Sequence, residues 1–143
     1  MNTKRFACSA LLILLLLSAC SAFQAPASTV EPTAEATIKA AAQPTAENIL
    51  QSFNNNDYNG VLRDMDTTMV KAFTQDSFNQ LQTKIANDYG AYQSVTYTGV
   101  TLAQGYYSVL FDCKFEKGSF TMRLVLTTQA PYQVSGLWFP DMK

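Results

Sequence analysis

Hydrophobic and polar residues alternate through two segments in the second half of the chain, residues 107–115 and 120–126. A period of two residues predicts β-strands with one buried face. If Lys117-Gly118 is a two-residue hairpin turn, Asp112 lies opposite Arg123 on the exposed face. The pairs on the other face are then all apolar: Phe115 with Phe120, Cys113 with Met122, Phe111 with Leu124, and Val109 with Leu126. A slip of one residue would expose the hydrophobic set, so the pattern specifies the register.

Two further strands flank this hairpin in the sequence. The hydrophobic positions of residues 92–102 change phase around Gly99, which predicts a β-bulge there. Gln104-Gly105 then forms the turn into the next strand. The last strand covers residues 132–139, with a second bulge at Gly136. Its large residues on one side are Tyr132, Val134 and Trp138.

The first half of the folded region has the spacing of amphipathic helices, because hydrophobic residues recur every three or four positions. The three groups are Ile49, Leu50 and Phe53; Tyr58, Leu62, Met65, Met69 and Phe73; and Phe78, Leu81, Ile85 and Tyr89. Thr45 is placed to cap the first helix and Thr74 the third, while Gly90 ends the third. Helices followed by strands predict an α+β fold, with N-terminal helices packed on a curved antiparallel meander of about four strands.

The first twenty residues form a separate unit. Lys4 and Arg5 precede an uncharged run over residues 6–17, which is shorter than the roughly 20 residues that a spanning helix needs. A basic start, a short hydrophobic core and small residues before a cleavage site are typical of a secretory signal. Residues 17–20, Leu-Ser-Ala-Cys, resemble the lipobox of a bacterial lipoprotein precursor. The resemblance implies cleavage after residue 19 and acylation of Cys20.

Acylation of Cys20 predicts a protein held at the extracytoplasmic face of the cell membrane, or at the outer membrane if the cell has two membranes. Residues 20–44 are rich in Ala, Thr, Pro and Glu, which predicts a disordered tether. As a coil this tether spans about 27 Å, and in polyproline form about 70 Å. The alternative is a short Ala-rich helix over residues 34–42, interrupted by proline at both ends.

Residues 45–143 have the composition of a single globular domain. They contain seven Lys or Arg and nine Asp or Glu residues without a cluster of either sign, so nucleic acid is not an expected partner. The chain has no histidine, which excludes Ser-His-Asp and Cys-His catalysis. Cys113 lies among core positions, where a thiol is usually inert.

Several short motifs, in their order and spacing, resemble the domain of unknown function 3887 over about residues 46–140. They are Asp57-Tyr58, Thr74, Tyr89-Gly90, Phe115-Glu116-Lys117-Gly118 and Gly136-Leu137-Trp138-Phe139-Pro140. That family resembles the nuclear-transport-factor-2-like, cystatin-like cone folds. The resemblance implies a cone-shaped domain in the cell envelope, and it supplies no catalytic residues.

Residues 55–66 place Asn, Asp and Gly residues at several positions of a calcium-binding loop. Only Asp57 and Asp66 would supply charged ligands, and a turn between helices accounts for the same residues. Asp64 and Asp66 are two residues apart, so they do not share a helix face. We therefore expect no metal, no cofactor and no catalytic residue.

Aromatic residues are the remaining candidates for a site. Tyr58, Tyr97, Tyr107 and Trp138 could line a pocket between helices and sheet, although the core of a small domain uses the same residues. The expected function is non-catalytic binding of a protein or a small ligand near the membrane. Leu110 and Val125 on the outer sheet face predict a protein partner or homodimer there. The alternative is a small enzyme that uses Asp/Tyr acid–base chemistry.

Overall fold

The computed structural model describes residues 27–142. Its elements follow in the order β1 (Ser28–Thr29), α1 (Pro32–Asn54), α2 (Tyr58–Leu62), α3 (Thr67–Ala72), α4 (Gln75–Asp88), β2 (Tyr92–Ala103), β3 (Tyr106–Phe115), β4 (Gly118–Thr127) and β5 (Val134–Trp138). The expected signal peptide and Cys20 lie outside the described residues.

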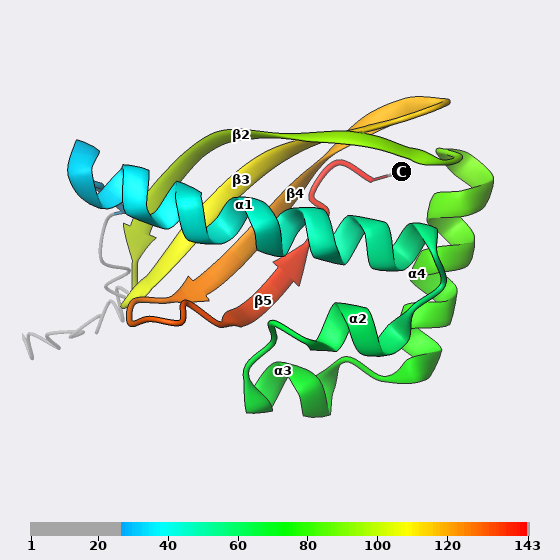
Figure 1. Cartoon of the computed structure of the whole chain (residues 1–143), viewed down its shortest axis with the longest axis horizontal. Helices are drawn as coiled ribbons and strands as arrows, with labels where there is room; N and C mark the ends of the chain where they lie inside the picture. The colour runs from blue at the N-terminus through cyan, green and yellow to red at the C-terminus, as the bar shows by residue number, and fades with distance from the viewer. Residues whose placement is uncertain (1–26, 143) are drawn as a thin grey trace, which may run out of the picture.

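The strands form one antiparallel sheet in the order β1-β2-β3-β4-β5. The long helix α1 crosses one face of this sheet, while α2, α3 and α4 gather towards one end (Figure 1). The expected α+β class with an antiparallel meander is confirmed. The sheet has five strands rather than about four, because the two-residue strand β1 pairs with Thr101 and Leu102.

Helix α1 begins at Pro32, so residues 32–44 do not form the expected disordered tether. Ile38 and Ala42 are buried against the sheet, which stabilises this half of the helix. Pro44 does not interrupt the helix, contrary to the alternative considered for residues 34–42. Its ring is exposed, as is Ala40 four residues earlier, so water can satisfy the carbonyl that Pro44 leaves without an N–H partner. Thr45 lies inside the helix and caps nothing.

The core lies between α1 and the inner sheet face, with α4 closing one end. Its largest fully buried side chains are Phe53, Phe78, Phe111, Ile38, Ile49, Leu50, Met122, Leu124, Leu126, Val61, Val109 and Val134. Phe53 stacks on Phe78 at 5.3 Å between ring centroids and meets Phe139 edge-on at 6.3 Å. This aromatic cluster joins α1, α4 and the segment after β5.

The β3–β4 register differs from the expected one by two residues. Phe111 is opposite Met122 and Val109 opposite Leu124, so the buried set is unchanged. The turn is Glu116-Lys117, and both residues bond to the neighbouring α4–β2 connection through their backbone N–H groups. These tertiary bonds outweigh the local preference of glycine for the turn. As a result Arg123 lies opposite Leu110, and Asp112 opposite Thr121.

Both expected bulges are present as register shifts. One lies between Tyr97 and Gly99 of β2, and the other at Ser135 of β5, next to Gly136. The second bulge reverses the alternation of β5, so Trp138 does not share a side with Val134 as expected. Val134 is buried in the core, whereas Trp138 pairs with Arg123 and is 45% exposed.

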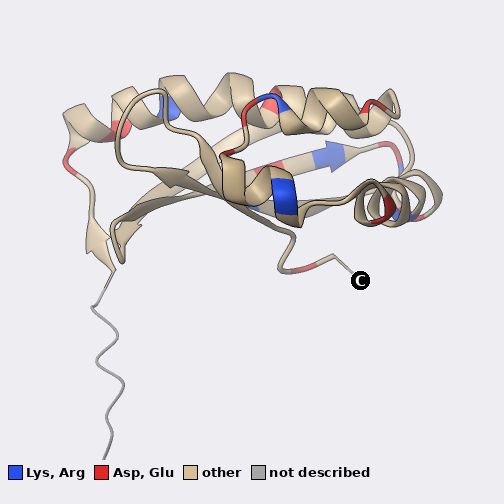
Figure 2. Ribbon diagram, turned by 90° about the horizontal axis from the view of Figure 1, so that it is seen from below, with Lys and Arg blue, Asp and Glu red and all other residues tan. Residues whose placement is uncertain are grey.

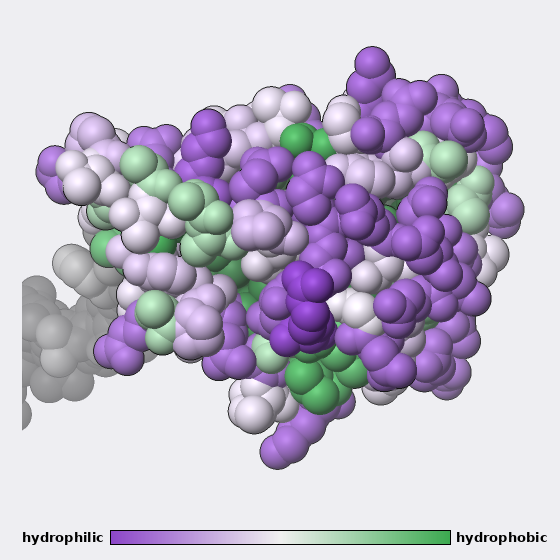
Figure 3. All heavy atoms as spheres, viewed as in Figure 1, coloured by the Kyte–Doolittle hydropathy of each residue, from purple (hydrophilic) through white to green (hydrophobic). Residues whose placement is uncertain are grey.

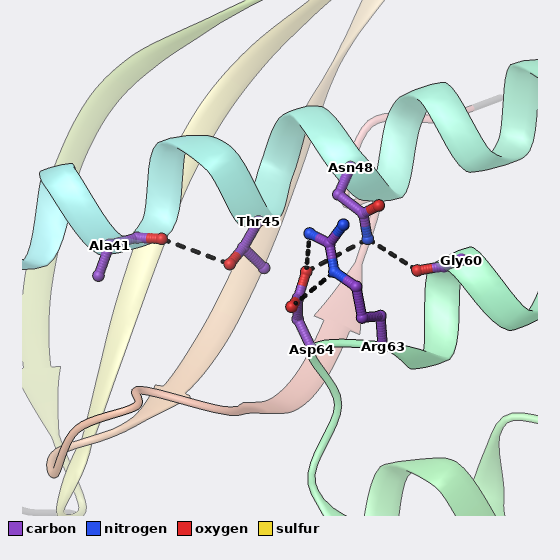
Figure 4. A network of polar contacts seen from close by, with 6 residues as sticks. All are labelled: Ala41, Thr45, Asn48, Gly60, Arg63 and Asp64. Carbon is purple, nitrogen blue, oxygen red and sulfur yellow. Dashed lines mark hydrogen bonds and ion pairs between the residues drawn. The ribbon is translucent and has the colours of Figure 1, made fainter.

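The helical segment over residues 58–73 is divided into α2 and α3. Asp57 caps α2 by accepting from the Gly60 N–H, and Asp66 caps α3. Thr74 caps α4 as expected, and Gly90 follows it with a φ of 80°. In Figure 4, Asn48 of α1 donates to the Gly60 carbonyl at 2.7 Å and to the Asp64 carboxylate at 3.2 Å. This contact fixes α2 against α1.

Lys and Arg positions are interspersed with Asp and Glu positions along the ribbon in Figure 2. Ion pairs among residues 27–142 are confined to Arg63–Asp64 and Lys84–Asp88, both between near neighbours in the sequence. None of the helices described is both long and apolar enough to cross a bilayer.

Candidate binding cleft on the open sheet face

The face of the sheet opposite α1, here called the outer face, carries an apolar and aromatic patch. We define the outer-face patch as Tyr106, Leu110, Arg123, Val125 and Trp138. Three of the four large hydrophobic residues that are exposed in residues 27–142 belong to it: Trp138 at 45%, Tyr106 at 44% and Leu110 at 38%. The fourth, Val70, belongs to α3; the helix-side view in Figure 3 is mostly hydrophilic, with a small hydrophobic group over α3.

A cleft of about 650 Å³ crosses the strands on this face. Its walls come from Ala27 just before β1, from strands β2 to β5, and from the start of α3. The lining residues are Ala27, Asp66, Thr68, Thr101, Ala103, Gln104, Tyr106, Ser108, Arg123, Val125, Ser135 and Trp138. Hydroxyl groups, one cation, one anion and two aromatic rings therefore border the same cavity. A concave site with a few polar groups is typical of ligand-binding surfaces.

Trp138 is held in this cleft by its neighbours. A Cβ atom at Gly136 would lie 2.0 Å from the Trp138 ring, so only glycine leaves room for the indole in this position. The Arg123 guanidinium carbon lies 4.9 Å from the centre of the Trp138 ring. Such a cation–π contact stabilises a pair by about 0.5–2 kcal/mol, depending on its exposure. Gly136 and Arg123 thus present the indole on the outer face.

Arg123 has no acidic partner within the described part of the chain, although its side chain is half-buried. Its Nε atom is buried and lacks a hydrogen-bond acceptor among those residues. A buried donor without a partner costs about 1–3 kcal/mol. Asp112 does not lie opposite Arg123 as expected, because the two-residue difference in register places Leu110 there. The cleft therefore offers a cation that is suited to an anionic ligand group.

Asp66 occupies the other end of the cleft and is already engaged. It accepts hydrogen bonds from the backbone N–H groups of Thr68 and Met69 at 2.9 and 2.8 Å. It also accepts from the Ser135 hydroxyl at 2.5 Å. The Ser135 bond, followed by the backbone bonds, holds the pKa of Asp66 below its ordinary value. Asp66 therefore stays ionised while it joins α3 to β5.

The four aromatic residues expected to line a pocket do not come together. Tyr58 donates to the Phe73 carbonyl at 2.7 Å, under the short helices. The Tyr97 side chain extends from β2 to Glu35 of α1. The Tyr107 ring packs against the Tyr132 ring, with 6.5 Å between the ring centroids. Among these four, only Trp138 lines the outer-face cleft. Leu110 and Val125 lie on the outer face as expected.

Two tyrosine–carboxylate pairs join α1 to β2. The Tyr92 hydroxyl donates to Glu47 at 2.6 Å, and the Tyr97 hydroxyl donates to Glu35 at 2.7 Å. Burial, followed by these hydrogen bonds, raises the pKa of both tyrosines. Neither pair lines the outer-face cleft. Their evident role is to fasten the long helix across the sheet.

The candidate calcium loop does not assemble as a metal site. Asp57 and Asp66 cap two different helices, and Asp64 pairs with Arg63 at 2.8 Å. Across residues 27–142, no three Asp, Glu, Cys or His side chains are grouped as metal ligands. Asp57 and Asp66 thus serve as caps at the starts of α2 and α3.

Cys113 is fully buried in the core, as expected. Burial raises the pKa of its thiol to about 12. A thiol in this state is almost entirely protonated at neutral pH, so it is a poor nucleophile.

Sequence reasoning missed Arg123 and Tyr106 as site residues. Arg123 was paired with Asp112 by the expected register, and Tyr106 directly follows a turn. The signal that could have found them is Gly136, two residues before Trp138, because a glycine on the same strand face leaves room for a large ring. The two-residue turn at Glu116-Lys117 would then have placed Leu110 and Arg123 beside that ring.

Comparisons with known proteins give a family and no named activity. A family model described as "Protein of unknown function (DUF3887)" matches residues 46–136, which is more than half of the chain. No curated protein and no solved structure matches.

Proposed function

We propose a function from the premise that this chain belongs to the DUF3887 family. It is a lipid-anchored module that binds anionic ligands at the extracytoplasmic face of the cell membrane. The observation that carries the binding site is Arg123, which has no ion-pair partner in the described residues and lies against Trp138. Arg binds carboxylates and phosphates in a planar geometry. The adjoining indole would contact a flat apolar part of the ligand.

The lipid anchor is the second part of the proposal, and it rests on the lipobox-like residues 17–20. Two or more acyl chains on Cys20 would hold the protein stably, because each buried CH₂ contributes about 0.8 kcal/mol. The protein would then face away from the cytoplasm. The long helix packed across an antiparallel meander supports the cone-shaped, cystatin-like fold as a further proposal.

The enzyme alternative has less support. Acid–base chemistry by a carboxylate and a tyrosine needs both groups at a cavity that admits substrate. The Tyr92–Glu47 and Tyr97–Glu35 pairs are instead bonds between α1 and β2. Asp66 in the outer-face cleft already accepts three hydrogen bonds. These contacts favour a structural role for the carboxylates.

Changing Cys20 to Ala is expected to abolish lipidation completely, because the thiol is the atom that carries the lipid. Cells fed an alkyne analogue of palmitate should label the wild-type protein and leave the variant unlabelled. Fractionation should place the variant outside the membrane pellet. The matched control is Cys8→Ala, which alters a thiol in the segment that is removed. Labelling of the Cys20 variant at the wild-type level would refute the anchor.

Binding of glycerol 3-phosphate tests the cleft directly. We expect a dissociation constant on the order of 1 mM, since one charged pair and one ring contact provide only about 4 kcal/mol. The NMR signals of Arg123 Nε–H and the Trp138 indole N–H should move during a titration of the mature chain. Arg123→Gln should remove the response, while Lys114→Gln, on the same sheet face, should keep it. An equal response in wild type and Arg123→Gln would refute the site.

A further inference from the structure

The outer-face cleft lies close to the proposed anchor along the chain. Ala27, the first described residue, lines the cleft, and β1 fixes the next two residues to the end of β2. Only six residues lie between Cys20 and Ala27, and the seven Cα-to-Cα steps that join the two span at most about 25 Å. The expected tether of 24 residues is therefore reduced to a short link, because α1 contains residues 32–44. The cleft wall at Ala27 cannot lie far from the lipid headgroups.

The residues of the outer-face patch match the chemistry of a membrane interface. Tyr and Trp prefer the headgroup region, where the ring is apolar and its polar atom remains hydrated. Trp138 and Tyr106 are both exposed at more than two fifths, and Leu110 lies on the same face, opposite Arg123. Arg123 is suited to a lipid phosphate, because its guanidinium forms paired hydrogen bonds with phosphate oxygens.

Charge alone does not provide this attraction. Asp66 lines the same cleft as Arg123, and Asp112 is on the outer face beside Lys114, so acidic groups accompany the two cations. The short link supplies the missing affinity, because attachment at Cys20 makes docking intramolecular, with an effective concentration in the millimolar range. A millimolar intrinsic affinity is then enough for substantial docking. The same domain without the link would stay in solution.

We infer that the outer-face patch docks on the headgroup surface of the membrane that holds Cys20, with Arg123 bound to a lipid phosphate. This inference rests on the proposed function and names the anionic ligand of the same site. Docking through this face leaves α1 and the opposite surface directed away from the bilayer.

The test attaches the mature chain to vesicles through the Cys20 thiol, using a maleimide lipid in place of the native acyl chains. Cys113 is buried and its pKa is about 12, so coupling occurs at Cys20. The vesicles contain phosphatidylcholine and phosphatidylglycerol. Trp138 is the only tryptophan of the chain, so its fluorescence reports the outer face alone. We expect a shift to shorter wavelength and quenching by lipids brominated near the headgroup.

Arg123→Gln is expected to lower the ratio of docked to undocked protein about tenfold, which corresponds to about 1.4 kcal/mol in the free energy of docking. Leu110→Ser, at an exposed position, should also reduce quenching and provides a second variant if Arg123→Gln fails to fold. Lys114→Gln is the matched control and should dock like the wild type. Circular dichroism of each variant checks that the fold is retained.

Three outcomes would overturn the inference. Unchanged Trp138 emission after coupling would mean that the face stays in water. A change that depends on protein density and not on brominated lipid would identify a second copy as the occupant. Binding of glycerol 3-phosphate without docking would leave the proposed function standing and identify a soluble ligand. The chemical coupling replaces native acylation. The vesicle experiment therefore tests docking even if the palmitate analogue does not label Cys20 in cells.

Discussion

Replacing Phe53 with alanine is expected to lower the free energy of unfolding by about 4 kcal/mol, the range for a buried phenylalanine. Phe53 is 1% exposed and contacts Phe78, Phe73 and Phe139. These partners come from α4, the end of α3 and the C-terminal segment, so the cavity would open where several elements meet. Surrounding rings cannot close such a cavity without losing their own contacts.

Urea unfolding followed by circular dichroism measures this loss, because the midpoint falls when stability falls at constant slope. The control is Val70→Ala on α3. Val70 is 40% exposed, so its change should stay within about 0.5 kcal/mol. A loss below about 1 kcal/mol for Phe53→Ala would contradict the packing of α1 against α4.

Replacing Asp66 with alanine is expected to cost about 1–2 kcal/mol at neutral pH, the usual range for a helix cap. The variant loses the bonds from Thr68 and Met69 that begin α3. It also loses the bond from Ser135 that joins α3 to β5. The control is Asp76→Ala, in the first turn of α4 but not at its cap. Its loss of stability should be only a few tenths of the loss caused by Asp66→Ala.

The difference between wild type and Asp66→Ala should depend on pH. The folded-state pKa of Asp66 lies below its unfolded value of about 3.9. The stability that ionised Asp66 contributes is therefore fully present above the unfolded-state pKa. It is lost as pH falls through the lower, folded-state pKa. Urea midpoints measured between about pH 7 and pH 2 should converge for the two proteins. A constant difference down to pH 2 would show that the charge of Asp66 contributes nothing.

Local patterns were sufficient to predict the class of the fold and most of its boundaries. The alternation in β3 and β4 identified the buried face correctly, because a shift of two residues leaves every side chain on the same side. Thr74 and Gly90 marked the ends of α4 correctly, since capping depends on adjacent backbone groups.

The register and the first half of α1 could not be read in this way. The β3–β4 turn is set by hydrogen bonds to residues 89 and 91, which are distant in the sequence. The helix over residues 32–44 has few large hydrophobic residues, yet burial of Ile38 against the sheet stabilises it. Both features depend on tertiary contacts that no local composition encodes. The candidate site was missed for the same reason, since Arg123 gains its neighbours only from the actual register.

The two-residue strand β1 also determines how the domain would respond to a mechanical load. Force transmitted along the chain from the N-terminal side reaches Ser28 and Thr29 before it reaches α1. Their pairing with Leu102 and Thr101 is small, so it would give way while the core remains intact. Release of the four residues before α1 would lengthen the link by about 14 Å at most. β1 would therefore act as a short extensible coupling that protects the fold from pulling.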